Sequence, residues 1–368
     1  MPTVVAIPAR DEEDRIGPCL RALIQDAVRP PDHVLVLVNN ASDATAARAR
    51  SWPAGTRTGI RTAIHVVERV LPPPLASAGH ARRIAMDLAA GLAGPDGLLF
   101  TTDADGRVDP SWLSAAVALL QRDLDLVAGW IELEPAEWAA IPMALHEDDA
   151  RECEYDALCD RIHDRLDPDP HDPLPRHTQN SGASLATTVA AFRRCGGVPP
   201  VSSGEDRALV EAMRRIDARI RHAPEMHGFV SGRLQGRATG GMAETIARRM
   251  SSPDTHLDDR LEPVDVVVLR ATSRRLARRA FDGRRPSDLS ALAEVLALSP
   301  DAVSRALDRS WFGTAWFELA RLSPRLLPRR VPVADLPREV AAARAVLGSD
   351  PPAAAAASPE PVTGDGAC

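Results

Sequence analysis

Two aspartates separated by one residue follow the apolar-rich segment 97–102, as Asp103-Ala104-Asp105. Carboxylates with this spacing at the end of a strand can face one divalent cation. A hard cation such as Mg²⁺ or Mn²⁺ takes oxygen ligands and prefers one or two carboxylates together with substrate phosphates. The same pattern is common in surface loops and helix caps, so the motif alone leaves both interpretations open.

Polar residues also follow two earlier apolar segments. The first is followed by Pro8-Ala9-Arg10-Asp11-Glu12-Glu13, and the second by Asn39-Asn40-Ala41-Ser42-Asp43-Ala44-Thr45. Such positions can bind a base and a ribose, and the helix that comes next can favour phosphate at its N-terminus. Capping by Ser42 or Asp43 accounts for the second segment at least as well.

Arginines and acids at three later positions add to this picture. Arg82 and Arg83 lie near the start of a predicted helix, where an arginine either neutralises a diphosphate or is simply solvated. Glu205 and Asp206 follow a glycine and begin a helix, which suits a general base or merely complements the helix dipole. The loop Ser231–Arg237 holds Arg233 and Arg237 among glycines, a composition suited to phosphate contact.

The elements that must position these residues alternate along the first half of the chain. Nearly continuous apolar runs predict strands, and stripes of apolar residues predict helices. The predicted strands are 3–7, 33–38, 63–68, 97–102 and 126–133, and the predicted helices are 12–26, 43–49, 78–93 and 110–120, the last with Asp109 as N-cap and Pro110 at its first position. This alternation predicts an α/β fold with a mostly parallel, doubly wound sheet flanked by helices.

The pattern changes after residue 135. Residues 136–176 are helical and acidic, and their end, 167–177, is rich in proline and aspartate, which predicts a mobile loop. Helices are expected at 187–195, 205–215 and 242–250, and another begins at Ser299-Pro300. We therefore expect one domain over 1–255, a helical arginine-rich extension over 256–349, and a disordered low-complexity tail over 350–368.

Composition sets outer limits on function. The 368 residues carry a net charge of −7, and all 44 basic residues are arginine. No apolar run approaches the roughly 20 residues of a membrane span, and no signal peptide is visible. Five scattered cysteines without a CxxC pair indicate neither a zinc site nor a disulfide framework. We expect a cytoplasmic protein that does not bind nucleic acid.

In order and spacing, these segments resemble the family 2 glycosyltransferases of the GT-A fold. The resemblance covers about residues 1–250 and is most specific in DADGRVDPSWL and GGVPPVSSGED. It implies transfer of a sugar from a nucleotide-diphosphate sugar to an acceptor hydroxyl, with Mg²⁺ or Mn²⁺. It also implies that Asp103 and Asp105 serve the metal and the donor, that Asp206 is the base with Glu205 beside it, and that the nucleotide site is lined by Pro8, Arg10, Glu12, Asn39, Asp43 and Arg82.

One departure from the family concerns the base of the nucleotide. Many relatives end the second strand in an acid, whereas Asn39 and Asn40 stand here, so the base is left open. The stereochemical outcome is also open, because some enzymes of this fold retain configuration and need no base. His222 or His227 could complete the metal site, although ordinary half-buried histidines are the favoured interpretation.

Two alternative functions stay open at this stage, and so does the role of one basic segment. A sugar-nucleotide pyrophosphorylase uses a similar sheet, but the segment after the first strand lacks that family's glycine-rich loop. A non-catalytic sugar-nucleotide-binding protein is disfavoured by the intact acids. The segment Arg270–Arg285 has seven arginines and one acid, which fits either peripheral contact with an anionic membrane or a solvated helix.

Overall fold

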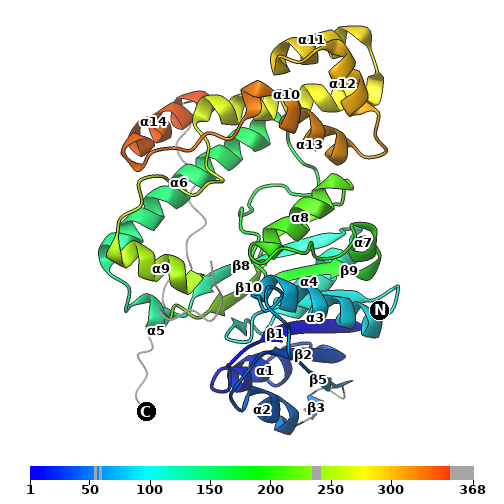
Figure 1. Ribbon diagram of the computed structural model, residues 1–368, viewed down its shortest axis with the longest axis vertical. Coiled ribbons are helices and arrows are strands. Elements are labelled where there is room, and N and C mark those ends of the chain that lie inside the picture. Colours follow the sequence, from blue (N-terminus) through cyan, green and yellow to red (C-terminus); the bar gives the residue numbers. More distant parts are fainter. Residues whose placement is uncertain (54–55, 58–59, 234–241, 349–368) are drawn as a thin grey trace.

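The structure is a computed structural model that describes residues 1–53, 56–57, 60–233 and 242–348 (Figure 1). The predicted disordered tail 350–368 and Arg237 of the predicted phosphate loop lie outside these residues. Within the described part of the chain, no helix combines the length and the apolar character needed to cross a lipid bilayer.

An eight-stranded sheet, in the order β5-β2-β1-β6-β9-β8-β10-β7, organises the N-terminal region. Its strands are β1 (Thr3–Ala9), β2 (His33–Asn39), β5 (Ala63–Arg69), β6 (Leu98–Thr101), β7 (Arg107–Val108), β8 (Leu126–Leu133), β9 (Leu185–Thr188) and β10 (Ile220–Val230). The strands β5, β2, β1 and β6 pair parallel with one another, and β8 pairs parallel with β10. β9 pairs antiparallel with both β6 and β8, and β7 pairs antiparallel with β10. A separate hairpin pairs β3 (Thr56–Arg57) with β4 (Ile60–Arg61). The prediction of a mostly parallel sheet is confirmed.

Helices cover both faces of this sheet. One layer consists of α1 (Ile16–Ile24), α2 (Thr45–Ser51) and α4 (Trp112–Leu120), and the other of α3 (Ala78–Ala93), α7 (Val189–Arg194) and α8 (Glu205–Arg215). Successive side chains of a strand point to opposite faces, so Val5 and Ile7 of β1 enter the first core while Val4 and Ala6 enter the second. Burial on both faces explains why these strands are apolar at every position.

The remaining helices form a second assembly beside the sheet (Figure 1). They are α5 (Pro135–Trp138), α6 (Met143–Leu166), α9 (Met242–Ser251), α10 (Val264–Gly283), α11 (Pro286–Leu296), α12 (Pro300–Leu307), α13 (Phe312–Leu322) and α14 (Leu336–Leu347), with 3₁₀ turns η1 (Pro324–Leu326) and η2 (Val333–Asp335). The helices α10, α11, α12 and α13 share one apolar core, and α6, α10 and α14 share another. Because α6 shares a core with C-terminal helices, the domain boundary at residue 255 stays a prediction.

Several element boundaries differ from those expected. The bounds of α3, α8 and β8 match the prediction, but α4 begins at Trp112 after Ser111, so Asp109 is not its N-cap. Asp109 instead binds His227 through its side chain. The antiparallel strand β9 was not predicted, since its four residues carry no pattern that separates them from a loop.

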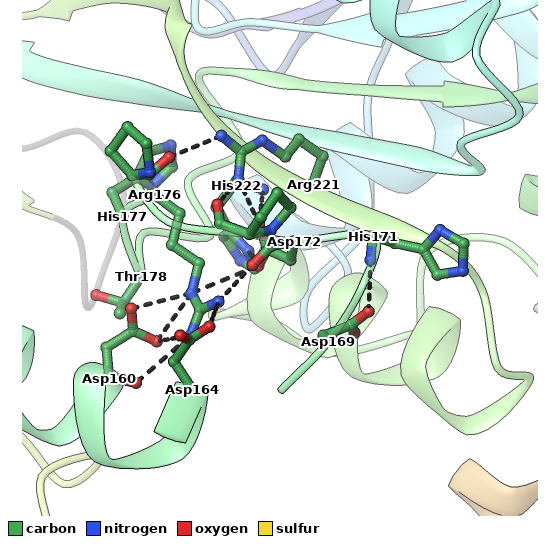
Figure 2. A network of polar contacts seen from close by, with 12 residues as sticks. Asp160, Asp164, Asp169, His171, Asp172, Arg176, His177, Thr178, Arg221 and His222 are labelled. Carbon is green, nitrogen blue, oxygen red and sulfur yellow. Dashed lines mark hydrogen bonds and ion pairs between the residues drawn. The ribbon is translucent and has the colours of Figure 1, made fainter. Parts of the chain in front are cut away.

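The proline-rich segment 167–177 is not the mobile loop that its composition predicts. The Arg176 guanidinium, whose side chain is only 7% exposed, binds Asp160 and Asp164 of α6 and the main-chain carbonyl of Asp172 (Figure 2). Asp172 also binds both the main chain and the ring of His222 in β10. Buried charges need such partners, so these contacts tie the segment to α6 and the sheet.

Candidate active site

The two aspartates lie in a tight turn that leaves the C-terminal edge of the sheet. β6 ends at Thr101. The main-chain N–H of the next residue, Thr102, donates a hydrogen bond to the carbonyl of Ala6 in β1 at 3.3 Å. Gly106 then closes the turn by donating to the Asp103 carbonyl at 3.1 Å. The turn therefore presents Asp103 and Asp105 beside the end of β1, at the edge where open α/β sheets bind ligands.

The Arg82 guanidinium lies buried beneath this turn. It binds the Asp103 carboxylate at 2.5 Å and the Glu205 carboxylate at 2.9 Å. It also donates to the Thr101 hydroxyl at 2.7 Å and to the Gly182 carbonyl at 2.8 Å. Only 6% of its side chain is exposed, so it does not extend into solvent as a diphosphate ligand would. One buried guanidinium thus joins α3 to three other segments of the chain.

A second arginine holds the outer side of the turn. Arg233 binds Glu12 through both guanidinium nitrogens, at 2.7 and 3.0 Å, and lies 3.1 Å from Asp105. Glu12 is buried at the end of β1, and Arg233 follows β10. Paired geometry of this kind fixes a guanidinium firmly. The structure therefore brings Glu12 and Asp105 to one guanidinium, with Arg233 as their shared counter-charge.

The electrostatics of this edge favour a cation. Burial, together with the charges of Asp103 and Glu12, raises the pKa of the Asp105 carboxyl to about 7 against the opposing charge of Arg233. Three carboxylates crowd a partly desolvated position that two arginines only partly neutralise. Such crowding is typical of ligand-binding acids.

Asp206 lies next to the buried arginine, at the start of α8. Its carboxylate accepts hydrogen bonds from the main-chain N–H of Gly182 at 2.8 Å and of Arg207 at 2.7 Å. A carboxylate has about four acceptor positions, so each oxygen keeps room for another donor. Its neighbour Glu205 is buried against Arg82 and lacks that freedom. The two acids therefore differ in what they can reach.

The predicted nucleotide-lining residues lie along the same edge, on the β1 and β2 side. Pro8 and the buried Asn39 stand in β1 and β2, and Arg10 is exposed just beyond β1. The Asp43 carboxylate joins the loops after the two strands, because it accepts from the main chain of Glu13 at 2.9 Å and of Thr45 at 3.0 Å. Within the described part of the chain, no hydrogen bond or ion pair links Pro8, Arg10 or Asn39 to Asp103 or Asp105, and the predicted roles of all four residues stay predictions.

Neither candidate histidine contacts the aspartates among the described residues. His222 is held between Asp172, at 2.6 Å, and Asn180, at 3.1 Å. His227 lies between Asp109, at 2.7 Å, and Glu132, at 3.0 Å. His222 is buried and His227 is half-buried, and both rings are engaged by protein partners.

The donor set fits a hard cation that keeps substrate oxygens in its coordination sphere. One carboxylate oxygen of Asp103 binds Arg82, and one carboxylate oxygen of Asp105 binds Arg233. The second oxygen of each carboxylate has no ion pair with another described residue. No group of three metal-ligating side chains occurs among residues 1–53, 60–233 and 242–348. Mg²⁺ characteristically binds through one or two carboxylates plus phosphates, so two carboxylates suffice.

Some residues of this site carry no sequence signal of their own. Glu137 in α5 accepts hydrogen bonds from the Ser231 hydroxyl at 2.9 Å and from the main chain of Gly232, and it pairs with Arg15. These contacts fix the segment that carries Arg233. Cys19 donates from beneath to the Asp103 carbonyl at 3.5 Å, and burial raises the pKa of its thiol. Only the folded chain brings them near the acids.

Comparisons with known proteins complete the description of this site. Solved structures that resemble the chain include a mannosyltransferase from Pyrobaculum calidifontis in complex with GDP-Man and Mn²⁺ (16% identity, 92% of this chain and 79% of that chain, TM-score 0.44). Others are S. aureus TarS 1–349 in complex with UDP (15%, 84% and 90%, 0.44) and glucosyl-3-phosphoglycerate synthase from Mycobacterium tuberculosis with Mn²⁺, UDP and phosphoglyceric acid (18%, 69% and 80%, 0.40). No curated protein sequence matches the chain.

The sequence itself matches one protein family. The match to "Glycosyl transferase family 2" covers residues 4–194, which is more than half of the 368 residues. It includes β1, the turn with Asp103 and Asp105, and Arg82. The mostly parallel sheet with flanking helices agrees with the GT-A-like class that the sequence predicts. The chain is therefore a nucleotide-sugar glycosyltransferase and belongs to glycosyl transferase family 2.

Proposed function

We propose that the protein moves a sugar from a nucleotide-diphosphate sugar to an acceptor hydroxyl with the help of Mg²⁺ or Mn²⁺, and that it inverts the anomeric configuration. One observation carries this proposal. The buried Arg82 guanidinium binds Asp103 on the donor side and Glu205 beside Asp206 on the acceptor side. A transferase needs its donor and acceptor groups held at a fixed separation, and a buried bridge of this kind supplies that separation.

The donor would lie along the edge from β2 to the Asp103 turn. Pro8, Asn39 and Asp43 lie where the base and ribose would bind, with Arg10 exposed beside them. Glu12 holds Arg233 at the outer side, where a guanidinium suits the negative diphosphate. Arg82 acts from beneath, by fixing Asp103.

Asp103 and Asp105 would hold the metal. A bound Mg²⁺ or Mn²⁺ would neutralise the charge that develops on the departing diphosphate. The crowding that raises the pKa of Asp105 to about 7 supports this assignment, because a cation relieves it. Arg233 lies 3.1 Å from the same carboxylate and would share the task of charge compensation.

Asp206 would accept the proton of the attacking hydroxyl. The acceptor oxygen forms a bond to the anomeric carbon, the bond from that carbon to the diphosphate oxygen breaks, and the proton passes to the Asp206 carboxylate. The N–H groups of Gly182 and Arg207 orient this carboxylate. Glu205 is buried on Arg82, so we assign it to positioning and not to proton transfer.

A donor panel tests the proposal. Nucleotide-diphosphate sugars of uracil, guanine and thymine are incubated with the full chain and Mn²⁺, and release of nucleoside diphosphate is measured. Release with one donor is expected. Formation of nucleoside triphosphate and sugar 1-phosphate when pyrophosphate is added would instead indicate the pyrophosphorylase alternative, and no release of any product would indicate the binding protein. Family membership favours the transferase over both.

Asp105→Asn sharpens the test. Removal of a charged ligand from a hard cation should sharply weaken donor binding and abolish its dependence on Mn²⁺, as measured by isothermal titration calorimetry. Asp14→Asn is the matched control, because Asp14 is 82% exposed and its nearest arginine is 3.9 Å away. Full metal dependence in Asp105→Asn would contradict the proposed metal site.

We also propose a cytoplasmic location and a peripheral contact with membranes. Cys19, Cys153, Cys159 and Cys195 are free thiols, which supports a cytoplasmic location. Peripheral contact through Arg270–Arg285 would require these arginines to face an anionic leaflet. Co-sedimentation with anionic vesicles at low salt tests it, and absence of binding would reject it.

A further inference from the structure

The turn of residues 102–106, which carries Asp103 and Asp105, is held differently at its two ends. Before it, β6 pairs with β1 on one side and with β9 on the other, inside the sheet. After it comes β7, an edge strand of two residues whose neighbour within the described residues is β10. So short a strand has little pairing of its own, and its place therefore depends on the side chains that hold it.

His227 of β10 binds the residue after β7 through both its main chain and its ring. The main-chain N–H of Asp109 donates to the His227 carbonyl at 3.0 Å, and the Asp109 carboxylate lies 2.7 Å from the ring nitrogen Nδ1. The other ring nitrogen, Nε2, lies 3.0 Å from the carboxylate of Glu132 in β8. The ring therefore joins the chain that leaves the turn to two longer strands.

The two partners of the His227 ring determine its charge. An ionised carboxylate only accepts hydrogen bonds, so each ring nitrogen needs a hydrogen in order to bind one. A histidine with a hydrogen on both nitrogens is the imidazolium cation. His227 thus places one positive charge between Asp109 and Glu132. Its side chain is 16% exposed, and water and salt screen such a partly buried charge less than an exposed one.

The other side-chain contacts of β7 are more exposed. The Arg107 guanidinium lies 4.3 Å from the centroid of the Phe229 ring and binds Glu134 at 2.9 Å. The Arg107 side chain is 44% exposed, and exposed ion pairs contribute little. The Phe229 ring also meets the His227 ring edge-on, with 4.7 Å between the centroids. His227 is therefore the better protected of the two attachments of β7.

We propose that His227 is a positioning residue for the metal site, and that it fixes the turn of Asp103 and Asp105 through Asp109. Both of its ring nitrogens are taken by carboxylates, so it acts through Asp109 and not as a ligand. The turn has little slack, because a Cβ on Gly106 would lie 3.4 Å from the Phe229 carbonyl oxygen. Groups behind the ligands that fix their orientation strengthen metal binding. The metal in this inference rests on the proposed function, whereas the attachment of the turn to β10 does not.

The two hydrogen bonds of the ring can be removed one at a time. The amide nitrogen of an asparagine takes about the place of Nδ1, and that of a glutamine takes about the place of Nε2. His227→Asn therefore keeps a donor for Asp109, and His227→Gln keeps a donor for Glu132. Positioning through Asp109 requires the first donor and not the second.

Titration with Mn²⁺ alone tests the proposal. The full chain is titrated, and free Mn²⁺ is followed by electron paramagnetic resonance. His227→Ala should weaken Mn²⁺ binding about tenfold or more, the range typical of groups that orient metal ligands. His227→Gln should bind as weakly as His227→Ala, and His227→Asn should recover most of the affinity. Parental affinity in His227→Ala, or tighter binding by His227→Gln than by His227→Asn, would overturn the proposal.

His222→Ala is the matched control for the loss of a histidine from β10. His222 is likewise held at both ring nitrogens, by Asp172 at 2.6 Å and Asn180 at 3.1 Å. Within the described chain no hydrogen bond or ion pair joins its side chain to residues 102–109. His222→Ala should lower stability in urea, as His227→Ala does, and leave Mn²⁺ affinity unchanged. An equal loss of affinity in both variants would reduce His227 to a merely structural residue.

Hydrogen exchange without metal separates this inference from the proposed function. Exchange in a peptide that covers residues 102–109 should rise in His227→Ala and stay at the parent's level in His222→Ala. A parent that binds no Mn²⁺ but shows this rise would refute the proposed metal site and leave the attachment of the turn standing. Unchanged exchange in His227→Ala would reject the attachment itself. If His227→Ala does not fold, His227→Gln takes its place in both measurements, with His227→Asn as the rescued form.

Discussion

The two ends of α8 have opposite electrostatic environments. At its start, Glu205 and Asp206 join Asp103, Asp105 and Glu12, and the acids outnumber the two arginines that bind them. Its last turn instead carries the arginines Arg214 and Arg215. A helix places its positive dipole end at the N-terminus, so this arrangement complements the dipole at both ends.

The two ends also differ in how their charges are held. Arg82 at the acidic end is buried and has four hydrogen-bond partners, whereas Arg214 at the basic end is exposed and has none among the described residues. A satisfied buried charge fixes geometry. The comparison assigns rigidity to the acidic end.

The largest effect is expected at Asp206. Asp206→Asn removes a proton acceptor and leaves the donor contacts in place, so transfer should fall by about 10²–10⁴ while donor affinity stays constant. Steady-state kinetics measure the first quantity and calorimetry the second. Glu211→Gln, on the same helix, should leave turnover nearly unchanged. Near-normal turnover in Asp206→Asn would instead support a retaining mechanism.

Arg82→Met should chiefly affect stability. It leaves Glu205, whose side chain is 8% exposed, without its counter-charge, and breaking a buried pair costs about 3–5 kcal/mol. Urea denaturation measures the loss. Arg83→Met is the matched control, because this neighbouring side chain is 38% exposed and its ion pair with Asp87 measures 4.0 Å.

The double variant separates pairing from packing. In Arg82→Met/Glu205→Gln the uncompensated charge is gone, so part of the lost stability should return. If Arg82→Met and Arg83→Met lost the same stability, the buried bridge would not be the element that holds the two sides of the site together.

The sequence was sufficient where local pattern determines structure. Continuous apolar runs gave the central strands, and Ser77 and Gly204 mark the starts of α3 and α8 as observed. The Asp103 turn was found because its residues are adjacent in the chain. These features depend on few residues beyond their immediate neighbours.

Contacts between distant segments could not be predicted in this way. The segment Gly79–Arg83 contains two arginines that look alike in sequence. Arg82 is the one that lies inside the protein, because Glu205, 123 residues later in the chain, binds it. Likewise the proline-rich loop looks mobile until Asp160 and Asp164 are seen to bind Arg176. Asp109 resembles an N-cap in sequence, but His227 of β10 binds its carboxylate.

The pH dependence of stability tests the network in Figure 2, which joins the segment 167–177 to α6 and β10. Burial lowers the pKa of His177 to about 3, and the charge of His222 contributes. The unfolded chain, with a histidine pKa near 6.5, therefore binds an extra proton between these values. Stability should be full above pH 6.5 and fall as the pH drops toward 3, by at most about 1.4 kcal/mol per unit.

His177→Asn should remove this dependence. The asparagine oxygen can still accept the Gln179 main-chain N–H that the ring nitrogen now accepts at 3.1 Å. Denaturation at pH 7 and pH 5 should then show a smaller difference than in the parent. His171→Asn, at an exposed position in the same loop, should retain the parent's difference. An unchanged difference in His177→Asn would show that other groups cause the acid sensitivity.

The smallest effect is expected where α13 meets the end of α8. Asp217 has a φ of 54°, so Asp217→Gly relieves backbone strain while it removes the acceptor for Phe312 and Gly313. Loss of such a cap costs about 0.5–2 kcal/mol, and hydrogen exchange at the start of α13 should increase. Asp123→Gly, at a φ of 72° and with a 79% exposed carboxylate, is the matched control. Because this junction lies at the opposite end of α8 from Asp206, Asp217→Gly should leave the Mn²⁺ dependence of donor binding intact; a change in that dependence would mean that the two ends of α8 are coupled.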